Sequence, residues 1–302
     1  MFSTSLAKPT VAVIGAGISG LTCARTLKDQ RVSVTVFEKS RGVGGRMATR
    51  RTDDGLRLDH GAQYFTVRSD LFYRYVDSWM HAGIVRRWGG QITVLARGQA
   101  TDRKSETERF VAVPAMNAIC KLLATDQQIH LQTRVARIER SGTRWILSDD
   151  GGSVLGEFDI VLVSAPAAQA AELLSAAPQL AAVAGRVDMH PCWAVMMAFD
   201  EPLNLEWDAA FVHDSPLTWI ARNSSKPGRQ SEPETWVMHA SPEWSRLHLE
   251  ASSSETGALL SSEFWTATAK SARPPRFCTA HRWRFALPVE PLDELCLFDA
   301  ER

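Results

Sequence analysis

An apolar run that leads into three spaced glycines restricts the fold of this chain more than any other feature. Val11–Ile14 is followed by Gly15, Gly17 and Gly20 in a Gly-x-Gly-x-x-Gly pattern. In a strand-turn-helix unit, the first glycine permits a tight turn, the second lets the backbone approach a pyrophosphate, and the third lets the helix pack closely on the strand. The pattern predicts a parallel α/β unit that binds a dinucleotide, with the diphosphate at the helix N-terminus.

The segments beyond these glycines agree with that prediction. A helix is expected over 18–28, and a second strand over 32–37 ends at Glu38. An acid about 20 residues beyond the glycines is placed to reach a ribose hydroxyl. This spacing leaves NAD and FAD both open. The candidate cofactor-binding residues of this unit are Gly15, Ala16, Gly17, Ile18, Ser19, Gly20, Glu38 and Lys39.

A second glycine cluster distinguishes the two cofactors. Arg41-Gly42-Val43-Gly44-Gly45-Arg46, taken with Asp59-His60-Gly61-Ala62-Gln63-Tyr64-Phe65, resembles the flavin-binding start of the amine oxidase superfamily, most closely that of bacterial renalase-like proteins. The resemblance implies an α/β protein with a Rossmann-type FAD-binding domain and a second, mainly antiparallel sheet domain for substrate. It also implies non-covalent FAD, and it adds these cofactor contacts: Gly45, Arg46, Gln63, Tyr64 and Val135. For Val135 the alternative of a plain core valine stays open.

The expected domains are discontinuous. The FAD-binding domain takes residues 1–68, 109–166 and 276–302, and the substrate domain takes 69–108 and 167–275. Residues 165–185 are expected to form paired surface helices, and the polar stretch 97–108 a surface loop. The resemblance implies a further Gly-Asp motif and a closing helix beyond residue 302. We therefore expect an incomplete gene model, a shortened chain, or a truncated remnant that binds FAD weakly or not at all.

Three later segments resemble renalase-like sequence near the catalytic cavity: 219–227, 238–241 and 280–283. Together with the residues that follow Gln63, they supply the candidate substrate contacts Tyr64, Phe65, Thr66, Arg68, Asn223, His239, His281 and Trp283. An arginine fork at Arg68 suits a phosphate or pyrophosphate. The alternatives are an exposed Arg68, structural roles for the two histidines, and tryptophans that fill the core.

The resemblance implies an oxidase for misreduced dihydronicotinamides, the 2- and 6-dihydro isomers of NAD(P). Hydride transfer to flavin N5 gives an aromatic pyridinium, and oxygen is then reduced to hydrogen peroxide. Such a reaction asks the protein mainly to orient two rings, so no side-chain nucleophile or base is required. A flavin amine oxidase or desaturase-like enzyme, and a non-catalytic remnant, remain as alternatives.

The net charge limits the classes of binding partner, and the cysteine content indicates the redox compartment. Lys and Arg number 34, as do Asp and Glu, so the net charge is zero, and neither nucleic acid nor an anionic membrane is an expected partner. The expected partners are a small-molecule dinucleotide and oxygen. The five cysteines lack a paired or metal-ligand spacing, which is typical of buried free thiols in a reducing compartment. With no run of ~18 apolar residues, the sequence predicts a cytoplasmic protein without a metal site.

Overall fold

The computed structural model describes residues 8–102 and 107–299, which form two compact units. The first unit takes its described residues from 1–45, 120–189 and 288–302, and the second from 46–119 and 190–287. The chain passes between the units four times. Each passage falls inside a continuous element: η1 (Gly45–Met47), α3 (Ala118–Leu123), β14 (Met189–Phe199) and β18 (Phe277–Pro288).

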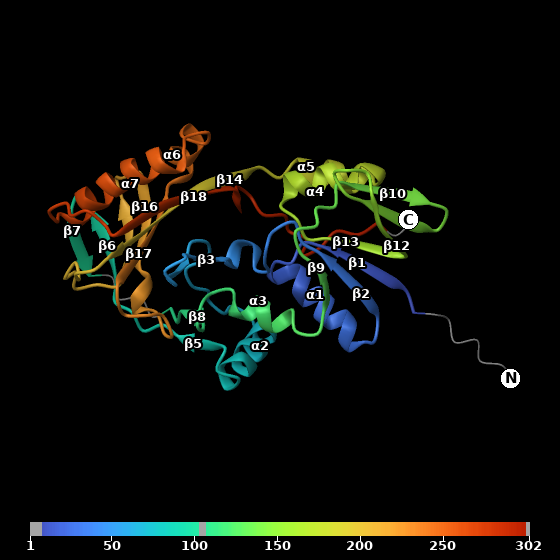
Figure 1. Ribbon diagram of the computed structural model, residues 1–302, viewed down its shortest axis with the longest axis horizontal. Coiled ribbons are helices and arrows are strands. Elements are labelled where there is room, and N and C mark those ends of the chain that lie inside the picture. The colour runs from blue at the N-terminus through green and yellow to red at the C-terminus, as the bar shows by residue number, and fades with distance from the viewer. Residues whose placement is uncertain (1–7, 103–106, 300–302) are drawn as a thin grey trace. The chain divides into compact units, whose positions relative to one another are not determined.

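A parallel sheet forms the base of the first unit. Its strand order is β13 (Ile160–Val163), β1 (Thr10–Ile14), β2 (Ser33–Phe37) and β9 (Gln128–His130), and every neighbouring pair is parallel. Helix α1 (Ile18–Asp29) connects β1 to β2 and packs against both, as Figure 1 shows. The predicted strand-turn-helix-strand unit is therefore confirmed.

The first unit also contains an antiparallel sheet and a helical pair. Strands β10 (Arg137–Ser141), β11 (Arg144–Ser148) and β12 (Val154–Phe158) form this sheet, in which β12 was not predicted. Helices α4 (Ala167–Leu173) and α5 (Pro178–Gly185), joined by η2 (Leu174–Ala176), contact one another, as the prediction of paired helices requires.

A seven-stranded sheet organises the second unit. Its strand order is β18, β14, β17 (Glu234–Ala240), β16 (Leu217–Arg222), β15 (Ala209–His213), β6 (Ile92–Ala96) and β7 (Gln99–Asp102). Five neighbouring pairs of this sheet have a defined register in the described chain. The β15–β6 pair is parallel and the other four are antiparallel. Strand β7 corrects the prediction of a loop over 97–108, because it pairs with β6; residues 103–106 lie outside the described chain.

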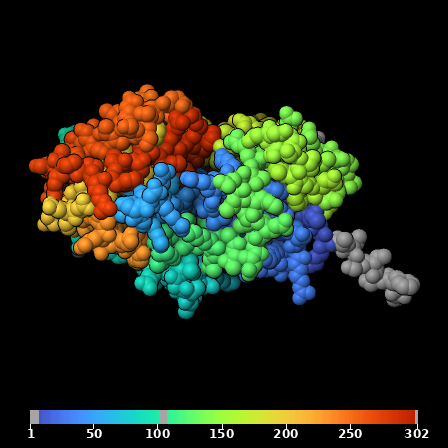
Figure 2. Space-filling model, viewed as in Figure 1, coloured from blue at the N-terminus to red at the C-terminus, as the bar shows by residue number. Residues whose placement is uncertain are grey.

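Helix α7 (Ser253–Thr268) completes the core of the second unit. Its Leu260 and Phe264 side chains are fully buried in one cluster with Trp236 of β17 and Met197 of β14. Figure 2 shows the outer surface of this helix and of α6 (Pro242–Leu247) in orange. The remaining elements of this unit are the β3–β4 ribbon (Thr49–Arg51 and Arg57–Asp59), α2 (Asp70–His81), the β5–β8 ribbon (Val85–Arg87 and Phe110–Ala112) and η3 (Asn223–Ser225).

The cysteines depart in part from the prediction of buried thiols. Cys120 is buried and Cys192 half-buried, but Cys23, Cys278 and Cys296 are exposed, so the prediction is wrong for these three.

Over residues 8–102 and 107–299, no helix is both long and apolar enough to cross a membrane. Nor does any group of three or more His, Cys, Asp or Glu in those ranges form a potential metal site.

Candidate cofactor and substrate sites

The glycine loop between β1 and α1 has two different kinds of glycine. Gly15 has a φ of +105°, and a Cβ there would lie 2.8 Å from the Ser164 carbonyl oxygen. A Cβ at Gly20 would overlap the Gly15 carbonyl oxygen. At Gly17, by contrast, a Cβ would have no described protein atom within 4 Å. Gly15 and Gly20 are thus required by the fold itself, whereas Gly17 borders open space.

The N-terminus of α1 faces that space with free donors. Gly17 is the N-cap residue, and no side chain in the described chain caps this end. The first turn of α1 contains no acidic residue. The Gly17 carbonyl accepts a hydrogen bond from the Leu21 amide at 3.0 Å. Unpaired N–H groups at a helix N-terminus favour an anion such as a pyrophosphate.

Glu38 is held beside this loop by backbone amides. Its side chain is buried, and its two carboxylate oxygens accept bonds from the Ala16 and Ser40 amides, both at 2.8 Å. Each oxygen has a second acceptor position, so the predicted bond to a ribose hydroxyl is compatible with this geometry. The next residue, Lys39, donates to Gln169 Oε1 at 3.0 Å, and burial, followed by the nearby Arg134, lowers its pKa.

The two glycine clusters of the sequence meet in the first unit. The Gly44 amide donates to the Ala16 carbonyl at 2.9 Å, and a Cβ at Gly45 would lie 3.2 Å from Gly17 Cα. Gly44 and Gly45 have φ values of +135° and +51°. The close approach explains why the second cluster needs glycines, and it places Gly45 beside the open face of the first cluster.

Val135 belongs to the core of the first unit. Its side chain is buried in a cluster with Ala12, Phe37 and Leu147. The sequence predicts a strand over 135–141, and β10 confirms it from Arg137 onward. Residues 133–135, which the resemblance places in a strand, precede β10, and the Thr133 amide donates to the Glu38 carbonyl at 2.9 Å. The predicted contact between the Val135 backbone and FAD stays a prediction.

Three predicted substrate residues of the second unit gather around His60. The His60 ring stacks on Trp283 at a centroid distance of 5.1 Å and meets the His281 ring edge-on at 4.6 Å. Its carbonyl accepts a bond from Trp283 Nε1 at 2.9 Å and lies 3.3 Å from His239 Nε2. His60 itself was not among the predicted site residues, although it stands inside the motif 59–65.

Burial makes this ring cluster electrically neutral. It lowers the pKa of His60 to about 3, with His281 contributing, and that of His239 to about 4. The pKa of His281 is lowered by burial and by Arg50. At neutral pH the cluster therefore offers uncharged aromatic faces. Within the described chain, His60 Nδ1 is buried without a hydrogen-bond partner.

A buried charged network lies next to these rings. Asp59 Oδ2 is 2.6 Å from Arg229 Nη2 and 3.7 Å from Lys226 Nζ, and all three side chains are at most 2% exposed. Lys226 also donates to Gln63 Oε1 at 3.0 Å. Desolvation lowers the pKa of Lys226 to about 8, and the Asp59 carboxylate limits the decrease. Neither Lys226 nor Arg229 was predicted, because a buried cation has no sequence signal apart from its distant partner.

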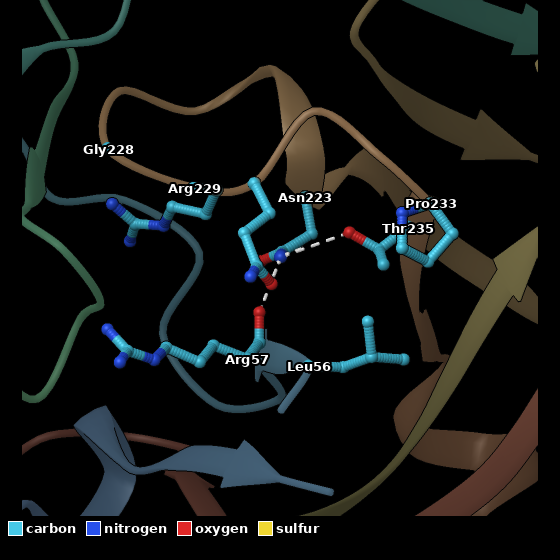
Figure 3. A pocket seen from close by; sticks show the side chains of 8 residues that line it. Leu56, Arg57, Asn223, Gly228, Arg229, Pro233 and Thr235 are labelled. Atoms are coloured by element: carbon cyan, nitrogen blue, oxygen red, sulfur yellow. Dashed lines mark hydrogen bonds between the residues drawn. The ribbon is translucent and has the colours of Figure 1, made fainter. Parts of the chain in front are cut away.

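The side-chain amides of Gln63 and Asn223 form hydrogen bonds within the second unit. Gln63 Nε2 donates to the Asp59 and Gly61 carbonyls. Asn223 Nδ2 donates to the Arg57 carbonyl at 2.9 Å and to Thr235 Oγ1 at 3.3 Å, as drawn in Figure 3, while its Oδ1 accepts from the Asp59 amide. These bonds tie the two residues to the second unit, and their predicted contacts with cofactor or substrate stay predictions.

The remaining predicted residues of the second unit divide into packed and open side chains. Phe65 packs on Phe72 and Phe110, with centroids 5.9 and 5.8 Å away, which gives its ring a structural role. Thr66 is half-buried, and Arg68 is exposed. Arg46 is exposed and donates to the Ala286 carbonyl at 3.0 Å.

Tyr64 forms part of an aromatic wall. Its ring lies 5.5 Å from that of Trp219 and 6.3 Å from that of Trp88. Two cations of the chain already occupy ring faces here: the Arg109 guanidinium lies 5.2 Å from the Tyr64 centroid, and Lys226 Nζ lies 5.7 Å from the Trp88 centroid. A cationic ligand would have to compete with these groups for the same faces.

Two protein-family models match successive ranges of the chain. Residues 13–79 match an NAD(P)-binding Rossmann-like domain, and residues 100–286 match the flavin containing amine oxidoreductases. The chain belongs to the flavin-containing amine oxidoreductase family. Membership in this family implies FAD, and the open face of Gly17, the uncapped α1 and the buried Glu38 all fit that cofactor.

Individual relatives of this amine oxidoreductase have diverse activities. It is 27% identical to a 4-hydroxybenzoate brominase (decarboxylating) from Pseudoalteromonas luteoviolacea over 51% of the chain and 25% of that protein. It is 47% identical to a 4,4'-diapophytoene desaturase from Staphylococcus aureus over 17% of the chain and 10% of that protein. The match thus spans a quarter or less of the length of these curated relatives.

Solved structures with the same fold cover nearly the whole chain. A putative protoporphyrinogen oxidase from Exiguobacterium sp. 255-15 superposes with a TM-score of 0.77 at 14% identity, covering 95% of this chain and 89% of that one. Putrescine oxidase bound to putrescine has a TM-score of 0.68 at 13% identity, covering 90% and 84%. These likenesses establish an amine oxidase-like fold for this family member.

Proposed function

We propose that this flavin-containing amine oxidoreductase is an oxidase that uses non-covalent FAD to remove a hydride from a small organic substrate. The observation that carries this proposal is the glycine loop, where Gly17 borders open space at the uncapped end of α1. The bound flavin would supply the hydride acceptor and return the electrons to oxygen. In the first unit, Gly15–Gly20, Glu38 and Gly45 would hold the pyrophosphate and ribose.

For the substrate, we propose the misreduced dihydronicotinamides suggested by the renalase-like resemblance. The neutral cluster of His60, His281 and Trp283 supports this choice, because an uncharged aromatic surface suits a neutral dihydropyridine ring. The cations on the faces of Tyr64 and Trp88 support it too, since they disfavour a protonated amine there. Oxidation of a dihydropyridine needs orientation and exclusion of water, and no base on the protein.

Amine oxidation is the second candidate, and the comparisons favour it. The family model covers residues 100–286, and putrescine oxidase shares the fold. An amine substrate would have to enter in its neutral form, and the histidines with lowered pKa would not repel it. Both candidates use the same FAD residues, so they differ only in what the second unit accepts.

Anaerobic reduction of the FAD-loaded protein separates the candidates. The reductants are 2-dihydro-NAD, 6-dihydro-NAD, ordinary NADH and putrescine, and the readout is bleaching of the flavin absorbance. We expect fast bleaching only with the 2- or 6-dihydro isomers, followed by hydrogen peroxide formation on admission of oxygen. Bleaching by putrescine alone would support amine oxidation instead. Protein that holds FAD and is bleached by none of the four would contradict both substrate proposals.

A further inference from the structure

The β3–β4 ribbon of the second unit presents two arginines directly opposite each other. Arg51 and Arg57 are paired residues of its antiparallel register, and both are exposed. Opposite residues in such a ribbon have Cβ atoms about 4.5–5.5 Å apart, and like charges there are destabilising. Among the described residues, neither side chain forms an ion pair or a hydrogen bond with an acid.

The carboxylates of the ribbon and of the adjoining loop either pair with other residues or are exposed without pairing to these arginines. Asp59, on the same face of β4 as Arg57, already forms ion pairs with the buried Arg229 and Lys226. Asp54 in the ribbon turn pairs with Arg276 at 3.1 Å. Asp53 and Glu232 are exposed, and neither forms an ion pair with the two arginines in the described chain. This face therefore carries an excess of positive charge. Arg87 of the β5–β8 ribbon, by contrast, pairs with Glu108 at 2.9 Å.

A cavity of about 150 Å³ opens beside Arg57. One water needs roughly 10–15 Å³ of such space, so a tetrahedral anion with its hydration fits. The polar side chains of its lining belong to Arg57, Asn223, Arg229, Gln230 and Thr235. In the view of Figure 3, the Arg57 and Arg229 side chains extend in the same direction.

The lining has hydrogen-bond donors to spare. Thr235 Oγ1 accepts a bond from Asn223 Nδ2, so its hydroxyl hydrogen remains free to donate. Gln230 is exposed and adds an amide. Arg57 has a complete guanidinium fork available, which is the geometry that binds phosphate oxygens in pairs.

We propose that this cavity is a binding site for a phosphate group, held by Arg57, Gln230 and Thr235 of its lining, and that Arg51, opposite Arg57 in the ribbon, adds positive charge from outside the lining. An anion there would also screen the repulsion between the two opposed arginines. The phosphate could be free or part of a nucleotide, since both present the same oxygens. The site lies wholly within the second unit and does not depend on the proposed oxidase activity.

Titration calorimetry of the FAD-saturated protein tests the proposal, with inorganic phosphate in one arm and ADP in the other at constant ionic strength. We expect binding that weakens about tenfold or more in Arg57→Gln, as befits loss of a charged hydrogen-bond donor. Arg51→Gln should weaken binding less. Arg57→Lys should retain part of the affinity as a point charge. Arg87→Gln is the matched control, with another exposed ribbon arginine removed.

Phosphate binding in the first arm would indicate a free anion, and binding only in the ADP arm would indicate a nucleotide. Either result supports the site if Arg57→Gln weakens the binding about tenfold or more. Affinity unchanged by Arg57→Gln, or an equal loss in Arg87→Gln, would overturn the proposal. So would wild-type protein that binds neither probe. Thermal unfolding gives an independent readout. Without phosphate, Arg51→Gln and Arg57→Gln should each melt above the wild type, and phosphate should raise their melting temperatures less than it raises that of the wild type.

Discussion

At the scale of single residues, Asp59 is a buried carboxylate that pairs with two buried cations of the second unit. It compensates two buried cations and accepts the Met116 amide at 3.0 Å. Asp59→Asn would leave Arg229 and Lys226 buried without a counter-charge. We expect the free energy of unfolding in urea to fall by about 3–5 kcal/mol. The exposed Asp54→Asn is the control, and an equal loss in both variants would contradict a special role for the buried network.

The buried histidines predict a dependence of stability on pH. The folded-state pKa values of His239, about 4, and His60, about 3, lie below the ordinary 6.5. The unfolded chain therefore binds more protons between these values, and stability is lost as the pH falls below about 6.5.

For His239, the slope is at most about 1.4 kcal/mol per pH unit for one proton. His239→Asn should remove that part of the slope between pH 6.5 and about 4. Urea unfolding measured across this range checks the effect. The exposed His213→Asn should leave the slope unchanged, and a slope unaltered in His239→Asn would argue against a neutral buried ring.

Single residues also show where sequence reasoning ends. The sequence identifies 59–65 as a flavin-type segment but does not single out His60, because the residues that contact it lie more than 170 positions away. The predicted substrate contact of Phe65 stays a prediction, and the packing of its ring on Phe110 has no signal in the local sequence. Residue type and local spacing do not show which distant ring an aromatic side chain packs against.

At the scale of elements, the glycine loop allows a matched pair of substitutions. Gly20→Ala places a methyl group on the Gly15 carbonyl and should destabilise the protein by about 1–3 kcal/mol or more. Gly17→Ala meets no described protein atom, so the stability of the FAD-free protein should change by no more than about 0.5 kcal/mol. FAD titration should nevertheless show affinity at least about tenfold lower for Gly17→Ala. Wild-type FAD affinity in Gly17→Ala would contradict the proposed cofactor position.

Helices and strands with a regular pattern of apolar residues were predictable from the sequence. Strands that contain glycine or mostly polar residues were not. The helix expected over 18–28 is α1, and the strand expected over 32–37 is β2. Strand β12 was missed because Gly156 interrupts its pattern, and its sheet position depends on pairing with β11. Strand β7 was missed because its residues are polar and pair only with β6 at the edge of the sheet.

At the scale of the whole molecule, the tryptophans allow separate observation of the two units. Only Trp145 belongs to the first unit; the second contains Trp79, Trp88, Trp193, Trp207, Trp219, Trp236, Trp244, Trp265 and Trp283. In Trp145→Phe protein, tryptophan fluorescence follows the second unit, while flavin fluorescence follows FAD release.

We expect FAD to stabilise both signals together, because every passage of the chain between the units runs inside a helix or strand. At a free concentration 100 times the dissociation constant, the gain is about 2.7 kcal/mol. Denaturant titrations at increasing free FAD concentrations measure the two midpoints. A midpoint that rises with FAD for the flavin signal, while the tryptophan midpoint stays constant, would show that the units unfold independently.

The interleaving of the units also sets the order in which a nascent chain can fold. Strands β1 and β2 emerge first, but their outer neighbours β9 and β13 are made only after residues 46–119 of the other unit. The seven-stranded sheet in turn waits for β18, near the end of the described chain. During synthesis both sheets therefore carry open edges at once, and early strand pairs need protection from wrong partners. Acquisition of FAD then becomes a late event in biogenesis, after translation has passed β13.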